Sequence, residues 1–242
     1  MSKIPFVFYG TDSVAQMALD ALREHDLVPS KNAEVAILVS YGKILTQEEI
    51  DSYRYGVINI HPSLLPKLRG PSPIKTAILD DLGKTGVSIM RIDEEIDHGP
   101  LLAKAEIDLS PRIATADELC LALIKQGVEL LADVLPKYLV GNLELKEQDH
   151  SLATYTRKFN PEDGLIEYPF TRGHEIDRKV RALNPEPSTY TLLSTNRGKK
   201  RVKILSGQVL EDMYEPNLVQ PAGKRPMTWS SFKNGYKFID PT

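Results

Sequence analysis

The sequence predicts an α/β protein with a doubly wound, mostly parallel sheet and a small β-rich module at its C-terminal end. In the first 184 residues, short apolar segments alternate with segments of helical periodicity. Alternation of this kind indicates parallel strands that are covered by helices on both faces. Two prolines, Pro185 and Pro187, then precede segments of β type. We therefore expect a larger domain over residues 1–184 and a module over residues 185–242.

The individual elements follow from local patterns. The apolar run "IPFVFY" predicts a first strand that ends in a turn at Gly10 and Thr11. Apolar residues at helical spacing follow from Val14 to Leu22 and predict a helix, which Asp12 or Ser13 caps. By the same criteria, further strands are expected at 33–42, 55–60, 85–92, 101–109, 189–193 and 201–210, and further helices at 46–53, 71–83, 115–141 and 173–184.

Composition indicates an ordinary soluble globular protein of 242 residues, with 41% hydrophobic and 26% charged residues. The single cysteine, Cys120, excludes an internal disulfide, and the N-terminal apolar run is too short for a signal peptide. There is also no apolar stretch of membrane-spanning length. We therefore expect a cytoplasmic protein with no membrane association.

Charge is distributed unevenly along the chain. Residues 185–242 carry a net charge of +4, from nine Lys and Arg against five Asp and Glu, whereas residues 1–184 carry −7. A basic tail on an acidic body is typical of contact with nucleic acid, and a solvated basic surface is the alternative explanation.

The segment "NIHPSLLP" holds the strongest chemical signal. Side chains alternate along a strand, so Asn59 and His61 should point to the same side. They lie at the carboxyl end of a strand, which is where ligands bind in open α/β sheets. An amide beside an imidazole suits the stabilisation of an oxyanion and the transfer of a proton. The alternative is a hydrogen-bonded pair that merely closes the strand.

A second polar segment, "IDEEIDHGP", places four carboxylates and His98 within six residues. One of these acids could orient His61, although the spacing does not identify which. The loop lacks the spacing of a calcium site. The turn after the first strand has only Gly10 where a dinucleotide fingerprint needs three glycines, so a nicotinamide or flavin cofactor is not expected.

Other polar features carry weaker signals. Lys67 and Arg69 follow the Asn59/His61 strand in a loop and could meet phosphate. The tail has two basic clusters, "RGKKRVK" and "PAGKRPM", which suggest phosphate contacts. His25, His150 and His174 have no patterned neighbours, and we expect them to be surface or structural residues.

Several motifs together resemble a known superfamily. "NIHPSLLPKLRGPSPI", followed by "TGVSIMRIDEEIDHG", is similar to the signature of the formyltransferases that use 10-formyltetrahydrofolate. Within that superfamily the chain most resembles the methionyl-tRNA formyltransferases. The segments that carry this resemblance are "FVFYGTDSVAQMALDAL", "VSYGKIL", "LATYTRKFNPEDGLIEY", "VRALNPEPSTY" and, in the tail, "QPAGKRPM".

The resemblance implies a formyltransferase catalytic domain at 1–184, a tRNA-binding module at 185–242, and transfer of a formyl group to methionyl initiator tRNA. It implies that Asn59, His61 and Asp97 form the catalytic triad. No metal is expected, because the 93–98 loop lacks the spacing of a calcium site. The predicted folate-binding residues are Tyr41, Gly42, Lys43, Ile44, Leu45, Ile92, Asp93 and Ile96. The predicted substrate- and tRNA-binding residues are Ser63, Lys67, Arg69, Lys199, Lys200, Arg201, Lys224 and Arg225.

The chain departs from this family in length. After residue 30 a segment is missing that normally supplies a strand, a helix and a loop that reaches the tRNA acceptor arm, so we expect a smaller sheet. The tail is shortened too, which predicts a partial, OB-like barrel. We expect a monomer. The alternative functions are an N-formyltransferase acting on a nucleotide-linked amino sugar, and a tRNA- or folate-binding protein without catalytic activity.

Overall fold

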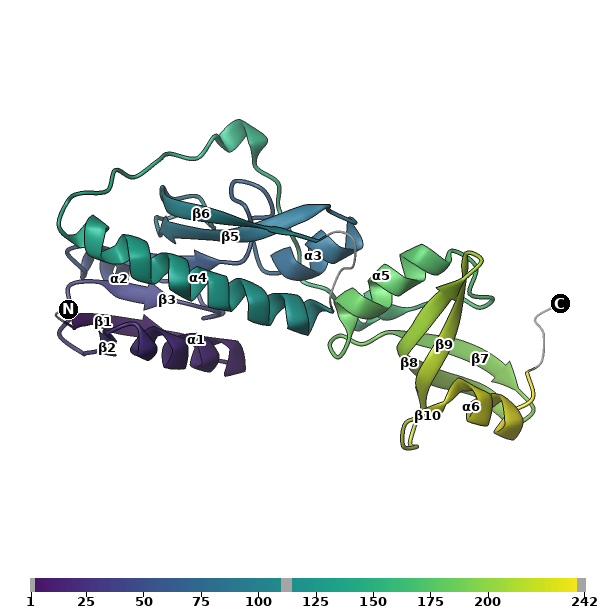
Figure 1. Ribbon diagram of the computed structural model, residues 1–242. Helices are drawn as coiled ribbons and strands as arrows, with labels where there is room; N and C mark the ends of the chain where they lie inside the picture. Colours follow the sequence, from purple (N-terminus) through teal and green to yellow (C-terminus); the bar gives the residue numbers. More distant parts are fainter. Residues whose placement is uncertain (1–2, 110–114, 239–242) are drawn as a thin grey trace. The chain divides into compact units, whose positions relative to one another are not determined.

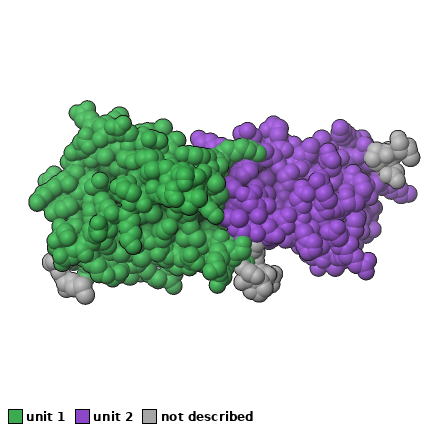
Figure 2. Space-filling view, turned by 90° about the horizontal axis from the view of Figure 1, so that it is seen from above, with its two compact units in different colours: residues 1–74, 83–113, 117–157 green, residues 75–82, 114–116, 158–242 purple. Residues whose placement is uncertain are grey.

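The computed structural model describes residues 3–109 and 115–238 (Figure 1). The chain divides into two compact units, shown in Figure 2. The first unit comprises Met1–Ile74, Gly83–Ile113 and Asp117–Arg157, and the second comprises Lys75–Leu82, Ala114–Ala116 and Lys158–Thr242. Residues 158–184 thus fall in the second unit, and the functional boundary at 184/185 stays a prediction.

The first unit is built on a six-stranded sheet with the order β2-β1-β3-β4-β5-β6. The pairs among its first four strands are parallel, whereas β5 is antiparallel to both of its neighbours. The mostly parallel sheet predicted from the sequence is therefore confirmed. The strands are β1 (Ile4–Tyr9), β2 (Leu27–Pro29), β3 (Ala36–Leu38), β4 (Val57–His61), β5 (Lys84–Arg91) and β6 (Leu101–Asp108).

The helices α1 (Ser13–Glu24), α2 (Gln47–Asp51), α3 (Pro73–Leu79) and α4 (Ala116–Leu139) lie where the sequence predicts them. Asp12 caps α1 by accepting the backbone N–H of Ala15, as expected. The long helix α4 runs along the sheet (Figure 1). At Gly127 it approaches so closely that an added Cβ would lie 2.5 Å from Cγ2 of Ile60 on β4. No helix within residues 3–109 and 115–238 combines the length and apolarity needed to cross a bilayer.

The connection between β2 and β3 is unusually short. Parallel strands are normally joined by about a dozen residues or more, usually a helix. Here residues 30–35 suffice, because β2 pairs with Ile4–Phe6 and β3 pairs with Val7–Tyr9, on opposite edges of β1. Two backbone hydrogen bonds, from Ser30 to Phe6 and from Val7 to Val35, fix the crossing at mid-strand. This connection has no room for a crossover helix or a long loop, and its brevity agrees with the missing segment.

The second unit contains an antiparallel four-stranded sheet with the order β10-β9-β8-β7. The predicted strands at 189–193 and 201–210 and the helix at 173–184 are confirmed, whereas β9, β10 and α6 were not predicted. The sheet packs on an apolar core that includes Val202, Ile204, Trp229 and Phe232. The elements are α5 (Gly173–Leu183), β7 (Tyr190–Thr195), β8 (Gly198–Leu210), β9 (Met213–Pro221), β10 (Met227–Thr228) and α6 (Trp229–Gly235); two 3₁₀ turns, η1 (His150–Leu152) and η2 (Pro161–Gly164), lie in the preceding irregular stretch.

Candidate active site

Asn59 and His61 project from the same side of β4 and converge on one carboxylate. Asn59 Nδ2 lies 3.5 Å from Asp97 Oδ1, and His61 Nδ1 lies 3.5 Å from the same oxygen. The two residues are only 8% and 4% exposed. Of the four acids between 93 and 97, the geometry therefore selects Asp97 as the partner of His61.

Asp97 reaches this position because its backbone is left-handed, with φ +50°. Aspartate tolerates this conformation better than most residues, but surrounding contacts must hold it. Its second oxygen, Oδ2, accepts the backbone N–H of Gly70 at 2.7 Å. Both carboxylate oxygens therefore face protein donors, and the side chain has a defined orientation.

The contact of the second ring nitrogen of His61 indicates which nitrogen carries a hydrogen. Nε2 lies 3.2 Å from the carbonyl oxygen of Leu68. A carbonyl oxygen only accepts hydrogen bonds, so Nε2 carries a hydrogen. The other ring nitrogen, Nδ1, faces Asp97. The contact between Nδ1 and the carboxylate is attractive when a proton lies between the two atoms. Both ring nitrogens of His61 thus face a protein acceptor.

A small pocket of about 180 Å³ opens beside this pair. Two of the large apolar residues that line it are exposed, Ile44 at 81% and Ile96 at 57%. A ligand that entered the pocket would remove this apolar surface from water. The pocket is lined by Leu38, Lys43, Ile44, Leu45, Asn59, Ile92, Asp93, Glu94, Glu95, Ile96 and Asp97.

Six of the eight predicted folate-binding residues line this pocket, whereas Tyr41 and Gly42 do not. The ring of Tyr41 instead packs edge-on against Tyr9, with centroids 5.2 Å apart. Its carbonyl accepts the hydroxyl of Thr11 at 2.9 Å. Tyr41 thus anchors the loop that presents Ile44 and Leu45.

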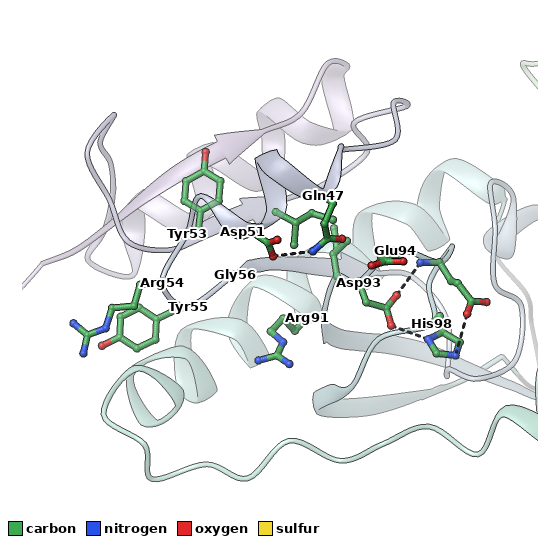
Figure 3. A pocket seen from close by; sticks show the side chains of 13 residues that line it. Gln47, Asp51, Tyr53, Arg54, Tyr55, Gly56, Arg91, Asp93, Glu94 and His98 are labelled. Carbon is green, nitrogen blue, oxygen red and sulfur yellow. Dashed lines mark hydrogen bonds and ion pairs between the residues drawn. The ribbon is translucent and has the colours of Figure 1, made fainter.

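A larger pocket of about 650 Å³ lies beside the start of β4 (Figure 3). It is lined by Arg54, Arg91, Asp93, Glu94 and Glu95 among others, but not by His61 or Asp97. Within it, His98 Nδ1 lies 2.7 Å from Asp93 Oδ2. Asp93 therefore pairs with His98 and not with His61.

Two predicted substrate-binding residues are inaccessible. Ser63 is fully buried, and its hydroxyl donates to the carbonyl of Lys67 at 2.8 Å. Arg69 is 1% exposed. Direct contact between these side chains and tRNA, as expected from the sequence, does not agree with this burial, whereas Lys67 is exposed as expected. Arg69 contacts Gln148, His150 and residues 154–156, and Ser63 accepts a hydrogen bond from Ser88; the local sequence shows neither set of contacts.

The basic residues of β8 lie on the two opposite faces of the strand, because side chains alternate along it. Lys199, Arg201 and Lys203 alternate along β8 with the buried Val202 and Ile204, so the three basic side chains share the exposed face. Lys200, one of the predicted contacts, belongs to the opposite face. Lys224 and Arg225 are exposed in the turn between β9 and β10.

Two residues on this face, Lys203 of the "RGKKRVK" cluster and Tyr190, were not among the predicted tRNA-binding residues. Lys203 continues the row at the same period of two, and that spacing could have identified it. Tyr190 on β7 lies under Arg201, whose Cζ is 3.8 Å from the ring centroid. Arg201 and Lys203 also line a pocket of about 450 Å³ with Gln220 and Pro221.

Comparison with known proteins assigns the family. Residues 3–135 match the formyl transferase family, and residues 158–217 match the formyl transferase C-terminal domain. The methionyl-tRNA formyltransferase of Chloroflexus aggregans is 36% identical, over 89% of this chain and 77% of its own length. The chain belongs to the methionyl-tRNA formyltransferase family. The relative from Thermotoga maritima is 34% identical over 89% of this chain and 74% of its own length.

Solved structures agree on the fold of this formyltransferase. The methionyl-tRNA formyltransferase from Clostridium thermocellum superposes with a TM-score of 0.67 at 19% identity, covering 90% of this chain and 98% of that one. HypX from Aquifex aeolicus, in complex with tetrahydrofolic acid, gives 0.76 at 16% identity over 96% and 46% of the two chains. An N-formyltransferase from Helicobacter canadensis, in complex with folinic acid and dTDP-3-aminofucose, gives 0.64 at 17% identity over 90% and 94%.

Proposed function

We propose that this protein transfers a formyl group from 10-formyltetrahydrofolate to the amino group of methionyl initiator tRNA, for the initiation of translation. The observation that carries the proposal is the convergence of Asn59 and His61 on Asp97 beside a pocket, in a chain of the methionyl-tRNA formyltransferase family. The site has the donors and the proton acceptor that acyl transfer to an amine requires.

We infer that the pterin end of the folate enters the 180 Å³ pocket. Pockets for whole drug-sized ligands measure about 300–1,000 Å³, so this one holds only part of the cosubstrate. Ile44 and Ile96 would cover the flat ring from the loops that follow β3 and β5. Solved relatives in complex with tetrahydrofolic acid and folinic acid support a folate as the donor.

In the proposed reaction, the methionyl amino nitrogen attacks the formyl carbon, a C–N bond forms, and the carbonyl electron pair moves to oxygen. Asn59 directs one N–H toward Asp97, and its other amide N–H can donate to the new oxyanion. The amine nitrogen gives its proton to the Asp97–His61 pair, and protonated His61 adds a positive charge beside the oxyanion. The electron pair on oxygen then re-forms the carbonyl while the bond to N10 breaks. The electron pair of that bond stays on N10, and the proton is returned there.

For the tRNA we propose a backbone contact through the exposed face of the second unit's sheet. Lys199, Arg201 and Lys203 stand in one row, and Lys224 and Arg225 extend the positive charge from the adjacent turn. Such a row suits phosphates, which position a nucleic acid without reading its sequence. Lys200 would support binding from the strand's other side, and Lys67 would meet the acceptor end near the site.

We infer that the protein acts in the cytoplasm and as a monomer. A single chain is sufficient for the proposed chemistry, because Asn59, His61 and Asp97 come from one compact unit. The tRNA-binding module is proposed to begin at residue 185, and the catalytic domain to end at 184.

The test is a competition between acceptors. The protein is incubated with 10-formyltetrahydrofolate, methionyl initiator tRNA and a nucleotide-linked amino sugar, and both formylated products are quantified. Formylated methionyl-tRNA alone is the expected product. Formylation of the amino sugar alone would assign the chain to the other acceptor class, and folate binding without either product would mean that it is a binding protein.

A further inference from the structure

Arg69 is the largest of the fully buried side chains, with 1% of its surface exposed. A cationic side chain is rarely buried without a counter-charge, because transfer of a charge out of water is costly. Among the described residues, no carboxylate lies within ion-pair distance of Arg69, and its Nε has no hydrogen-bond partner. Stability alone is therefore a poor explanation for its presence.

The guanidinium is held by neutral acceptors from one later segment. Nη2 lies 2.8 Å from Gln148 Oε1 and 2.8 Å from His150 Nδ1, while Nη1 makes a longer contact of 3.4 Å with the hydroxyl of Tyr155. Because arginine only donates, His150 must accept through Nδ1. Its ring in turn stacks on His98, with centroids 3.9 Å apart.

Gln148 continues this network to the catalytic loop. Its Nε2 donates to the carbonyl of Asp97 at 3.0 Å and to that of Gly99 at 2.7 Å. These bonds hold the left-handed backbone that aims the carboxylate of Asp97 at His61. One amide side chain thus joins Arg69 to the backbone of Asp97.

The backbone of Arg69 is tied to the same later segment. Its N–H donates to Thr154 at 2.9 Å, and its carbonyl accepts from Thr156 at 2.7 Å. Its neighbours contact the catalytic pair directly, since Leu68 accepts from His61 and Gly70 donates to Asp97. Leu68 is itself left-handed, with φ +60°, and needs such support.

We propose that Arg69 is a positioning residue, which fixes the backbone of Asp97 through Gln148 and the ring of His61 through Leu68. The inference rests on the proposed function, because it concerns the rate of the proposed formyl transfer. Arg69 keeps the three groups aligned without touching either substrate. Small displacements of reacting groups are sufficient to lower the rate strongly.

The test compares Arg69→Lys with Gln148→Met in the full chain. Lysine keeps the charge but lacks the planar fork that reaches two acceptors at once, and methionine keeps the shape of Gln148 without its amide. Each variant is expected to lower kcat for formyl transfer about tenfold or more, while KM for methionyl-tRNA and Kd for tetrahydrofolate change less than about threefold. The double variant should lose little more than Arg69→Lys alone, because Gln148 lies on one of the two routes by which Arg69 acts.

Gln126→Met on α4 is the matched control, and its kcat should equal that of the wild type. The ¹⁵N shifts of the His61 ring nitrogens give a readout that does not depend on turnover; they should change in Arg69→Lys and Gln148→Met but not in the control.

The inference is overturned if both variants keep the wild-type kcat and His61 shifts, or if kcat falls only in proportion to the folded, folate-binding fraction. If Arg69→Lys does not fold, Gln148→Met decides alone. An inactive wild type would contradict the proposed function, and the His61 shifts would still test the role of Arg69.

Discussion

His61 and Asp97 face each other across 3.5 Å, from Nδ1 to Oδ1, although 35 residues lie between them in the sequence. Each is held from its other side by the 68–70 segment, through the Leu68 carbonyl and the Gly70 N–H. The proposed proton transfer depends on this arrangement, since both groups must keep their orientation while the acceptor amine approaches.

Replacement of Ile44 by aspartate should weaken folate binding. Covering an isoleucine by ligand contributes about 1.5–3 kcal/mol, so Kd for tetrahydrofolate should rise about tenfold or more. The change is measured by equilibrium titration. Leu121→Asp, an exposed leucine on α4, should leave Kd unaltered. An unchanged Kd in Ile44→Asp would place the folate elsewhere.

Binding of tRNA should depend steeply on salt if the basic row contacts phosphates. The logarithm of the affinity should fall linearly with the logarithm of salt concentration, and Arg201→Gln should reduce the magnitude of the slope by about 0.7–0.9. Lys84→Gln on β5, which removes a surface charge paired with Glu106, serves as the control and should leave the slope unaltered. A slope near zero in the wild type would remove the proposed phosphate contacts.

Gly127→Ala should destabilise the protein despite the better helix propensity of alanine. The new Cβ would lie 2.5 Å from Ile60 and 2.9 Å from Val87, and such overpacking costs about 1–3 kcal/mol. Alanine regains about 1 kcal/mol in the helix. The Tm from thermal unfolding should therefore fall. Gly83→Ala, where a Cβ meets no atom within 4 Å, should not lower it.

Cys120 should react slowly with alkylating reagents. Burial, with a smaller contribution from nearby Asp117, raises the pKa of its thiol from 9.0 to about 11. Between these values the unfolded chain binds fewer protons than the folded one, so this group lowers the free energy of unfolding as the pH rises from 9 toward 11. At pH 8 the native protein should react with iodoacetamide about a hundredfold more slowly than the urea-unfolded chain. Equal rates would contradict the raised pKa.

The sequence predicted the site as far as local patterns extend. Asn59 and His61 follow from strand periodicity, but the choice of Asp97 among four acids came only from the resemblance. Asp97, and not another of these acids, faces His61 because the backbone at Asp97 is left-handed and because Asp93 pairs with His98. Neither can be seen in the spacing.

Arg69 shows where local patterns were insufficient. A charged residue in a loop with prolines and glycines is usually exposed, yet Gln148 and His150 bury it from 79 and 81 residues further along the chain. Those two residues lie in an irregular stretch without periodicity, so they carried no signal of their own.

The elements that were missed are short or contain proline. β2 has three residues and ends in Pro29, which an edge strand tolerates. Pro216 similarly interrupts the pattern of β9. Helix α6 has seven residues, and its position depends on the burial of Trp229 and Phe232 in the second unit's core. Tertiary packing determined these elements more than propensity did.

The most direct test of the proposed mechanism is the single-turnover rate of formyl transfer to methionyl initiator tRNA, measured for the wild type and for Asn59→Ala, His61→Ala and Asp97→Ala. Loss of one donor to an oxyanion costs about 2.7–4 kcal/mol, so each variant should be slower by about a hundredfold or more while it still binds tetrahydrofolate. A variant that keeps a near-normal rate would contradict the role assigned to its residue. Near-normal rates in all three would mean that the reaction does not take place between Asn59, His61 and Asp97.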